Sequence, residues 1–587
     1  MLFNQNKLDS RATFPLIRRY WGAGFALFLA ATLIIIPSAP AAAFLSEKSC
    51  LGVAQRGSET GKAFSVEVAN VHDLALLRKA LEDFLANDLI YFNDYSVYLQ
   101  KGREDGHIDA LQKRFLAAAE RIDALLDEYF DAEGGQVKAS QIARTSRVIF
   151  AKANNLPPYE SLEAIRKIIY RLNERFLTHP ELNYYLFVDA DNIRNGRFVV
   201  FPCRIRARAA MEDDGTHVDV FFLELLRPTR THGAKGIAKT VRNVLGNDTV
   251  NVYFSGLPFL GKYIPETKHM CINVEQIDEN VGQRMEFFRL MNKEMQQRKK
   301  IKLKLGPNLF IVHDYKAILR DGTVTEKMLE QDARATLTLN AILFTLGKMK
   351  RAEMYGFRPR IEAQNQKSIA ELATMPGVPT SLDTFMDRPA SPERVKELVT
   401  KVNMVLDDIT GFLTALAYGE KVWTSEIYRI YQWAQYPERN FRMAIAARYV
   451  LASIAQAVAA DDQTGSIQKI MKRARKFPNA TEMYMAVLYE YITGTQTSTE
   501  TMKQIAHHLI ERGIDLPRLY TTGIHGLGIS SDVFYRITGT TPDEHSVPLK
   551  KSIEPLVEHI RKECWPYILD INIIPVPADI SDISKSA

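Results

Sequence analysis

The feature that most constrains the fold is a change of hydrophobic period near residue 180. Residues 64–177 repeat apolar side chains every three to four positions, as at Leu77, Leu81 and Leu85, and this spacing predicts amphipathic helices. From Tyr184 onward apolar and polar residues alternate, which predicts strands. Helical spacing returns further along the chain. The sequence therefore predicts a predominantly helical α+β fold, with a central antiparallel sheet of about five strands between helical domains.

Five segments with strand character account for the predicted sheet. They are Tyr184–Val188, Arg197–Met211, His217–Leu226, Thr249–Phe254 and Lys268–Val274. Between the last two lies a loop rich in glycine and proline, Ser255–Pro265. After the strands we expect a helix over Asp278–Lys300, a strand or short helix over Leu309–Leu319, and a long helix beginning near Thr323 with a capping box.

The register of the long hairpin follows from its turn. If residues 214–216 form a three-residue loop with Gly215 in the left-handed conformation, Asp213 faces His217. One face of the hairpin then carries the apolar residues Ile205, Ala207, Ala209, Phe221, Leu223 and Leu225. The other face carries Arg204, Arg206 and Arg208, with Glu224 opposite Arg206. Three guanidinium groups in a row predict a binding site for a carboxylate or phosphate ligand.

Composition divides the chain into six segments. We predict a signal peptide or membrane anchor (1–43), a helical domain (44–180), an α+β domain (181–362), a linker (363–391), a second helical domain (392–565) and an extended tail (566–587). The linker is predicted from four prolines among serine, threonine and aspartate. Ser391 and Pro392 then begin the next helix.

The amino-terminal segment predicts export. Arg18 and Arg19 precede the uncharged stretch 20–46, whose apolar block 22–36 is followed by small-residue cleavage patterns. It functions either as a cleaved signal peptide or as an uncleaved membrane anchor. Both alternatives place the remaining chain outside the cytoplasm, in a periplasm or at the cell surface, because the basic residues stay on the cytoplasmic side.

Charge and cysteine content refine this prediction. The formal net charge is +6, and the first 43 residues contribute half of it, so we expect no nucleic-acid partner. Of the four cysteines, Cys50 and Cys564 could join the ends of the exported chain. Cys203 and Cys271 lie in predicted strands, where we expect free, buried thiols.

No segment has the ligand spacing of a metal site, and we expect neither a bound metal nor a cofactor. His313, Asp314 and the later Asp332 lack the second histidine of a zinc-protease helix. His507 and Glu511 lie one helical turn apart but are only two ligands. His269 and Cys271 would share a strand face without further ligands. The glycine-rich segment 523–532 follows no strand and is interpreted as a turn between helices.

Two basic clusters are candidate partner surfaces. They lie at residues 298–304 and 469–476, and in an exported protein such clusters predict contact with anionic lipid, an acidic polymer or another envelope protein. The favoured function is a non-catalytic binding or structural component of the cell envelope, exported or membrane-tethered. The alternative is an extracytoplasmic hydrolase of peptide or glycan, whose site is assembled from residues distant in sequence.

Overall fold

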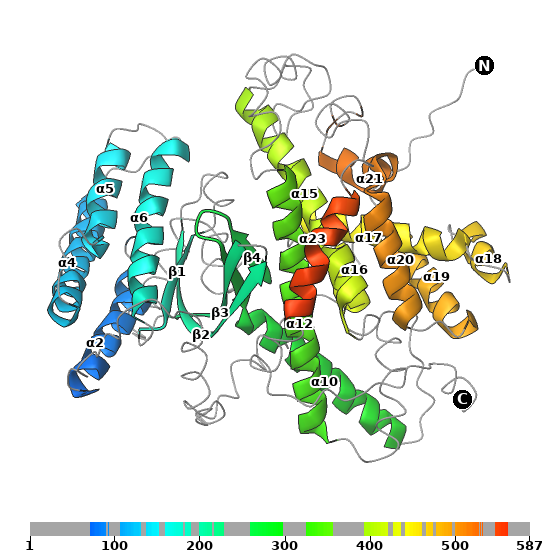
Figure 1. The fold of residues 1–587 in the computed structure, drawn as a ribbon, viewed down its shortest axis with the longest axis horizontal. Helices are drawn as coiled ribbons and strands as arrows, with labels where there is room; N and C mark the ends of the chain where they lie inside the picture. The colour runs from blue at the N-terminus through cyan, green and yellow to red at the C-terminus, as the bar shows by residue number, and fades with distance from the viewer. Residues whose placement is uncertain are drawn as a thin grey trace, which may run out of the picture. The chain divides into compact units, whose positions relative to one another are not determined.

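The computed structural model describes most of the helices and strands of the chain (Figure 1). The described residues are 71–89, 92, 106–130, 137–151, 159–179, 182–188, 199–213, 216–227, 257, 259–296, 325–355, 392–420, 426–435, 441–460, 465–473, 477–495, 499–527, 529, 531, 534 and 546–560. All belong to the compact unit Asn70–Ala587. The predicted signal segment, the linker 363–391, the tail 566–587 and the predicted elements at Thr249–Phe254 and Leu309–Leu319 lie outside the described residues.

The amino-terminal part is a layer of helices, as the apolar spacing predicts. Its elements are α2 (Val71–Asp83), the π-helical turn η1 (Phe84–Asp88), α4 (Gly106–Tyr129), α5 (Ala139–Ala151) and α6 (Tyr159–Thr178). Their apolar faces form one core with the first strand of the sheet, in which Leu81, Ile122 and Ile165 are completely buried. In Figure 1, α6 stands between α5 and this strand.

The sheet has five strands, and the predicted α+β class is confirmed. They are β1 (Tyr184–Val188), β2 (Val200–Asp213), β3 (Thr216–Leu225), β4 (Gly261–Ile264) and β5 (His269–Asn273), in the order β1-β2-β3-β5-β4. The sheet is curled and mixed, because β3 and β5 are parallel while the other pairs are antiparallel. The expectation of a purely antiparallel sheet is therefore wrong at one pair. The long connection between β3 and β5 gives the chain room for the crossover that a parallel pair requires.

One strand lies where the sequence predicts a loop. β4 occupies Gly261–Ile264, within the segment 255–265 that glycine and proline mark as irregular. Four residues are too few to establish an alternating pattern, so the pairing of β4 with β5 defines this strand.

The hairpin of β2 and β3 differs from the predicted register. Asp213 pairs with Thr216 instead of His217, so two residues connect the strands instead of three. The register shifts again between Ile205 and Ala207, where Arg206 is the extra residue of a β-bulge.

The bulge also reverses the face of the sheet on which the later side chains of β2 lie. Ile205 pairs with Leu223 and shares its hydrophobic cluster, as predicted. Ala207 pairs with Phe222, and both Ala207 and Ala209 pack against a different core. The prediction that Ile205, Ala207 and Ala209 share one face is therefore wrong for the two alanines, because one inserted residue reverses the alternation.

The carboxyl-terminal helices pack around the second end of the sheet. They are α10 (Val274–Gln296), α12 (Glu326–Tyr355), α15 (Pro392–Tyr418), α16 (Tyr428–Gln435), α17 (Phe441–Ala460), α18 (Ser466–Lys472), α19 (Ala480–Thr495), α20 (Thr499–Arg512), α21 (Leu516–Thr522), the 3-10 turn η4 (Ile524–Leu527) and α23 (Ser546–His559). One continuous core joins them to β3 and β5. The boundaries of the predicted domains stay a prediction, but this core includes helices from both sides of the predicted linker.

Two helices begin at residues other than those predicted. The long helix α12 is capped by Thr325, whose Oγ1 accepts a hydrogen bond from the backbone N of Met328 at 3.2 Å, so the predicted start near Thr323 is two residues early. α10 begins directly after β5, because the side chain of Asn273 accepts from the backbone N of Gln276 at 3.3 Å.

Close helix packing at the centre depends on two glycines. A Cβ on Gly411 of α15 would lie 2.7 Å from the carbonyl oxygen of Phe344 on α12. A Cβ on Gly347 of α12 would collide with the hydroxyl of Thr414 on α15. The two helices therefore approach each other more closely than any larger residue at these positions permits.

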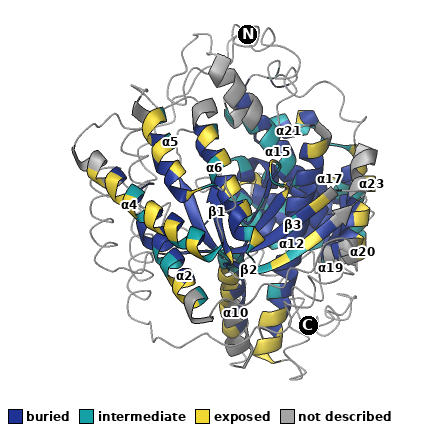
Figure 2. Cartoon of the chain, turned by 60° about the vertical axis from the view of Figure 1, so that its left-hand side comes forward, coloured by how far each residue is buried: buried dark blue, intermediate teal, exposed yellow. Residues whose placement is uncertain are grey.

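Helix α17 is the one described helix that is long and apolar enough to cross a membrane by composition. Most of that stretch is buried among the other helices, and residues such as Ile445, Val450 and Ile454 are completely buried in the shared core. In this structure α17 is a central packing helix (Figure 2).

The outer edge of strand β1 is bound by one side-chain amide. Asn173 of α6 is completely buried; its Nδ2 donates to the carbonyl oxygen of Leu186 at 2.8 Å, and its Oδ1 accepts from the Leu186 backbone N at 2.7 Å. These are the outward-facing backbone groups of an edge strand, which would otherwise be buried without partners.

The same helix also reaches the turn between β4 and β5. Arg166 of α6, which is buried, donates to Glu266 of that turn at 2.8 Å and to Glu163 at 2.5 Å. Because β1 and β4 are the two outer strands, α6 connects both ends of the sheet and keeps it curled.

We expect Asn173→Ala to lower the free energy of unfolding by about 2–4 kcal/mol, because two buried backbone groups of Leu186 lose their partners. Chemical denaturation followed by circular dichroism measures this change. Glu174→Ala is the matched control, since Glu174 is the next residue of α6 and is exposed, and it should change stability by less than about 0.5 kcal/mol. Equal effects of the two substitutions would contradict the role of the amide.

Candidate functional site

The three arginines predicted to bind a ligand each contact another part of the protein. Arg204 donates to Glu82 of α2 at 2.5 Å. Arg206 places Nε 2.6 Å from Oε2 of Glu224. The predicted position of Glu224 opposite Arg206 is nevertheless wrong, because Glu224 pairs across the strands with Arg204. Arg208 lies over the ring of Phe221, with 5.9 Å between its guanidinium carbon and the ring centroid.

The bulge separates these arginines between the two faces of the sheet. Arg204 pairs across the strands with Tyr184 and Glu224, whereas Arg208 pairs with Phe221, which lies on the opposite face. The predicted row on a single face is therefore wrong. Ligand binding by the three residues stays a prediction, but they cannot clamp one small anion together.

Of the basic clusters, 298–304 lies outside the described residues and 469–476 is described as far as residue 473. Lys469 and Lys472 occupy the last turn of α18, and they and Arg473 are exposed. Three cations at a helix carboxyl terminus also suit the helix dipole, so their role as a partner surface stays a prediction.

A buried polar cluster lies on one face of the sheet. The hydroxyl of Tyr185 on β1 lies 3.0 Å from Nδ1 of His269 on β5. Cys271 lies on the same face of the sheet and is completely buried. Side chains of Phe221 and Tyr170 border the cluster, which excludes water from it. As expected from alternation, His269 and Cys271 share this face, while Met270 packs in the core on the other side.

Burial keeps the members of this cluster uncharged. It lowers the pKa of His269 from 6.5 to about 4, with the charge of Asp219 opposing the shift. It raises the pKa of Cys271 from 9.0 to about 12 and that of Tyr185 well above its ordinary value. At neutral pH the phenol therefore donates to a neutral imidazole, and the thiol is not ionised. A protonated thiol is a poor nucleophile and a poor metal ligand.

Cys203 and Cys271 are both free and buried, which confirms the prediction for the inner pair. Burial is also the main cause that raises the pKa of Cys203 well above its ordinary value. Cys50 and Cys564, which could join the ends of the chain, lie outside the described residues.

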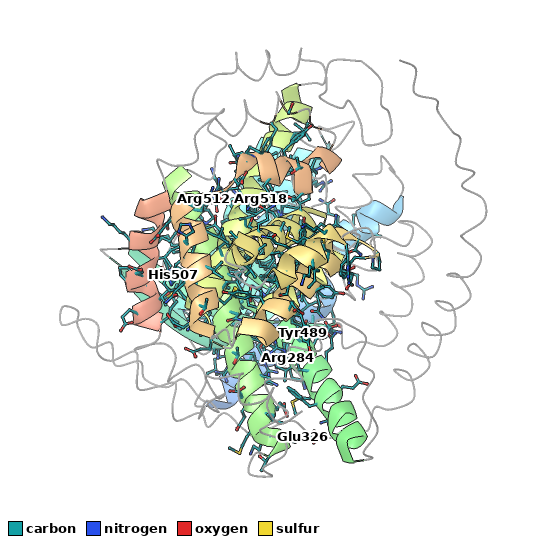
Figure 3. All side chains as sticks on the ribbon, turned by 90° about the vertical axis from the view of Figure 1, so that its right-hand side faces the viewer. Arg284, Glu326, Tyr489, His507, Arg512 and Arg518 are labelled. Carbon is teal, nitrogen blue, oxygen red and sulfur yellow. The ribbon has the colours of Figure 1, made fainter. Side chains whose placement is uncertain are left out.

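The remaining metal candidates are dispersed. Asp332 is completely buried on α12, while His313 and Asp314 lie outside the described residues. His507 lies on α20 (Figure 3). It packs edge-on against the ring of Tyr418, with 4.6 Å between centroids. In the described part of the chain, no three or more histidine, cysteine, aspartate or glutamate side chains gather in a metal-binding group.

The largest feature that sequence reasoning missed is a buried charged network at the centre of the carboxyl-terminal helices. Asp408 of α15 is completely buried. One of its oxygens lies 2.5 Å from Nζ of Lys348 on α12, and the other lies 2.8 Å from Nε of Arg442 on α17. The preceding residue, Asp407, pairs with Arg351 of α12. Two adjacent carboxylates of α15 thus bind cations from two other helices.

A second buried ion pair adjoins this network. Glu426 is completely buried and pairs with Arg429 of α16. The guanidinium of Arg429 lies 4.7 Å from the ring centroid of Phe344 and 5.3 Å from that of Phe412. Lys348 lies 5.1 Å from the same Phe344 ring, so one aromatic side chain adjoins both charged groups.

Burial opposes the ionisation of Asp407, Glu426 and Lys348, and their ion pairs counteract it. It raises the pKa of Asp407 and Glu426, against the neighbouring charges of Arg351 and Arg429. It lowers the pKa of Lys348, against the charge of Asp408. A signal in the sequence exists, because Asp408 lies within the apolar spacing of α15 between Val405 and Phe412. Its cationic partners are distant in sequence and could not be assigned.

Comparison of the chain with protein-family models, curated proteins and solved structures gave no match.

We expect the unfolding free energy to fall as the pH is lowered from 6.5 to about 4, because in this window the unfolded chain protonates His269 and the folded protein does not. The complete pKa shift of His269 corresponds to about 3 kcal/mol of unfolding free energy. Denaturation at a series of pH values measures it. His269→Asn keeps an acceptor for Tyr185 and should flatten this pH dependence. An unchanged slope in His269→Asn would contradict the assignment.

We expect Asp408→Asn to lower the unfolding free energy by about 3–5 kcal/mol, because Lys348 and Arg442 lose the carboxylate that compensates their charge. Denaturation followed by circular dichroism measures this change. The control is Glu120→Gln in the exposed ion pair with Arg144, where the loss should be below about 1 kcal/mol. A loss at Asp408 no larger than that of the control would show that the network is not structural.

Proposed function

We propose that the protein is an exported or membrane-tethered component of the cell envelope with a non-catalytic binding or structural role. The proposed location rests on the amino-terminal sequence, where Arg18 and Arg19 precede the apolar block 22–36. This polarity of charge would direct the following residues out of the cytoplasm.

The observation that supports a binding role is the state of the reactive groups in the described part of the chain. His269, Cys203 and Cys271 are buried, and His269 already makes an internal hydrogen bond with Tyr185. The buried carboxylates of the helical core are paired with cations. Groups held in this way stabilise a fold, whereas general acids, bases and nucleophiles must reach a substrate. The alternative is a hydrolase; of its candidate residues, His269 and Asp332 are buried and His313 and Asp314 lie outside the described residues.

We expect a reporter enzyme that is active only outside the cytoplasm to be active when fused after residue 60, because the charge bias orients the segment before it. The same fusion without residues 1–43 is the control and should be inactive. Activity of a cytoplasm-specific reporter at the same position would contradict the proposed location.

The two forms of the proposal differ at the amino terminus of the purified protein. A first residue at Ala42 or Phe44 would identify a cleaved signal peptide, whereas an intact Met1 would identify a membrane anchor.

A further inference from the structure

The solvent-facing side of helices α4, α5 and α6 is strongly cationic. Among the residues of 106–179 whose exposure is described, eight lysines and arginines are exposed, but only three carboxylates are. The cations include Lys113 and Arg121 of α4, Arg144 and Arg147 of α5, and Lys167 and Arg171 of α6. We refer to this surface as the α4–α6 face; Figure 2 shows exposed residues along all three helices.

The helices that carry these cations are held firmly together. The buried carboxylate of Asp123 on α4 accepts hydrogen bonds from the backbone N of Ala139 and Ser140, at 2.6 and 2.9 Å, and so caps α5. Asp127 of α4 pairs with Lys138 at 2.5 Å and with the buried Arg175 of α6 at 2.9 Å. The α4–α6 face is therefore a preformed surface, and its cations do not need to be assembled when a partner binds.

Apolar side chains lie among the cations. Val148 directly follows Arg147 and is 55% exposed. Ala117 and Ala124 are exposed on α4, two helical turns apart. A surface that combines spread cations with small apolar side chains matches the boundary between lipid headgroups and acyl chains.

We infer that the α4–α6 face docks onto a bilayer that contains anionic lipid. The inference rests on the proposed function, which places the protein at the envelope. The cations extend over three helices instead of lining one groove, and this arrangement fits a plane of phosphate groups better than a single polymer strand. The apolar side chains add contacts that a soluble polyanion does not offer. This assignment differs from the basic clusters chosen from sequence, neither of which includes these helices.

The expected loss of affinity for the bilayer follows from the electrostatic attraction of each cation. Each lysine or arginine close to an anionic bilayer increases affinity about fivefold, and this gain falls as salt is added. Replacement of one cation on each helix should therefore weaken binding by more than about tenfold.

The test is sedimentation of the exported full-length protein with vesicles. Phosphatidylcholine vesicles carry no net charge, so binding to them measures attachment through the amino-terminal segment. The additional binding to phosphatidylglycerol-rich vesicles measures the contribution of anionic lipid. We expect the anionic contribution to be large, to decrease with salt, and to fall more than about tenfold in the variant Arg121→Glu, Arg147→Glu, Arg171→Glu. Thermal unfolding of the variant checks that it folds, and single charge reversals replace it if it does not.

The matched control is Lys327→Glu, Arg512→Glu, Lys551→Glu on α12, α20 and α23, which reverses three exposed cations outside the α4–α6 face and changes the net charge equally. It should bind nearly as well as the unmodified protein. Equal losses in both variants would overturn the inference, because attraction would then follow net charge. Binding of a soluble polyanion such as polyglutamate through the α4–α6 face, without vesicle binding, would overturn it in favour of an acidic polymer.

The failure of this inference is distinguishable from the failure of the proposed function. Vesicle binding is measured on purified protein, whereas the compartment is measured by the reporter fusion. An active reporter without vesicle binding would overturn the docking surface alone, and an inactive reporter would overturn the proposed location whatever the vesicles show.

Discussion

The carboxylate of Asp408 is the interaction on which the larger half of the structure depends. It is completely buried in α15 and compensates Lys348 of α12 and Arg442 of α17, so three helices meet at one charged group. Buried ion pairs add little net stability compared with apolar packing, but they tolerate few alternative arrangements, because a displaced partner leaves a buried charge uncompensated. The network therefore fixes the relative placement of helices whose apolar faces could pack in several ways. The close approach at Gly411 and Gly347 acts in the same direction.

The amino-terminal half is organised differently. Its helices are joined mainly by apolar packing and by carboxylates near the surface, such as Asp127, whose pKa is lowered chiefly by its hydrogen bond with Lys138. Helix α6 connects this layer to the sheet by Asn173 and Arg166. The carboxyl-terminal half thus joins three helices at one buried carboxylate, while the amino-terminal half exposes more cations than carboxylates on α4, α5 and α6.

Sequence reasoning succeeded where the relevant information is local. The bounds of β1 and the helical character of the first layer follow from the spacing of apolar residues, and the two inner thiols follow from strand burial. It failed where one residue decides the outcome. The bulge at Arg206 has no marker in the sequence, yet it reverses the faces of Ala207 and Ala209 and divides the predicted arginine site. The charged network pairs residues about 35 to 60 positions apart, so no local pattern could assign its pairs.

The capture of outer backbone groups of β1 has a consequence for how the protein can assemble. The backbone N and carbonyl oxygen of Leu186 are occupied by Asn173. A neighbouring chain therefore cannot extend the sheet by pairing with β1 at this position, although strand addition is the usual route to donor-strand complexes and to fibrous aggregates.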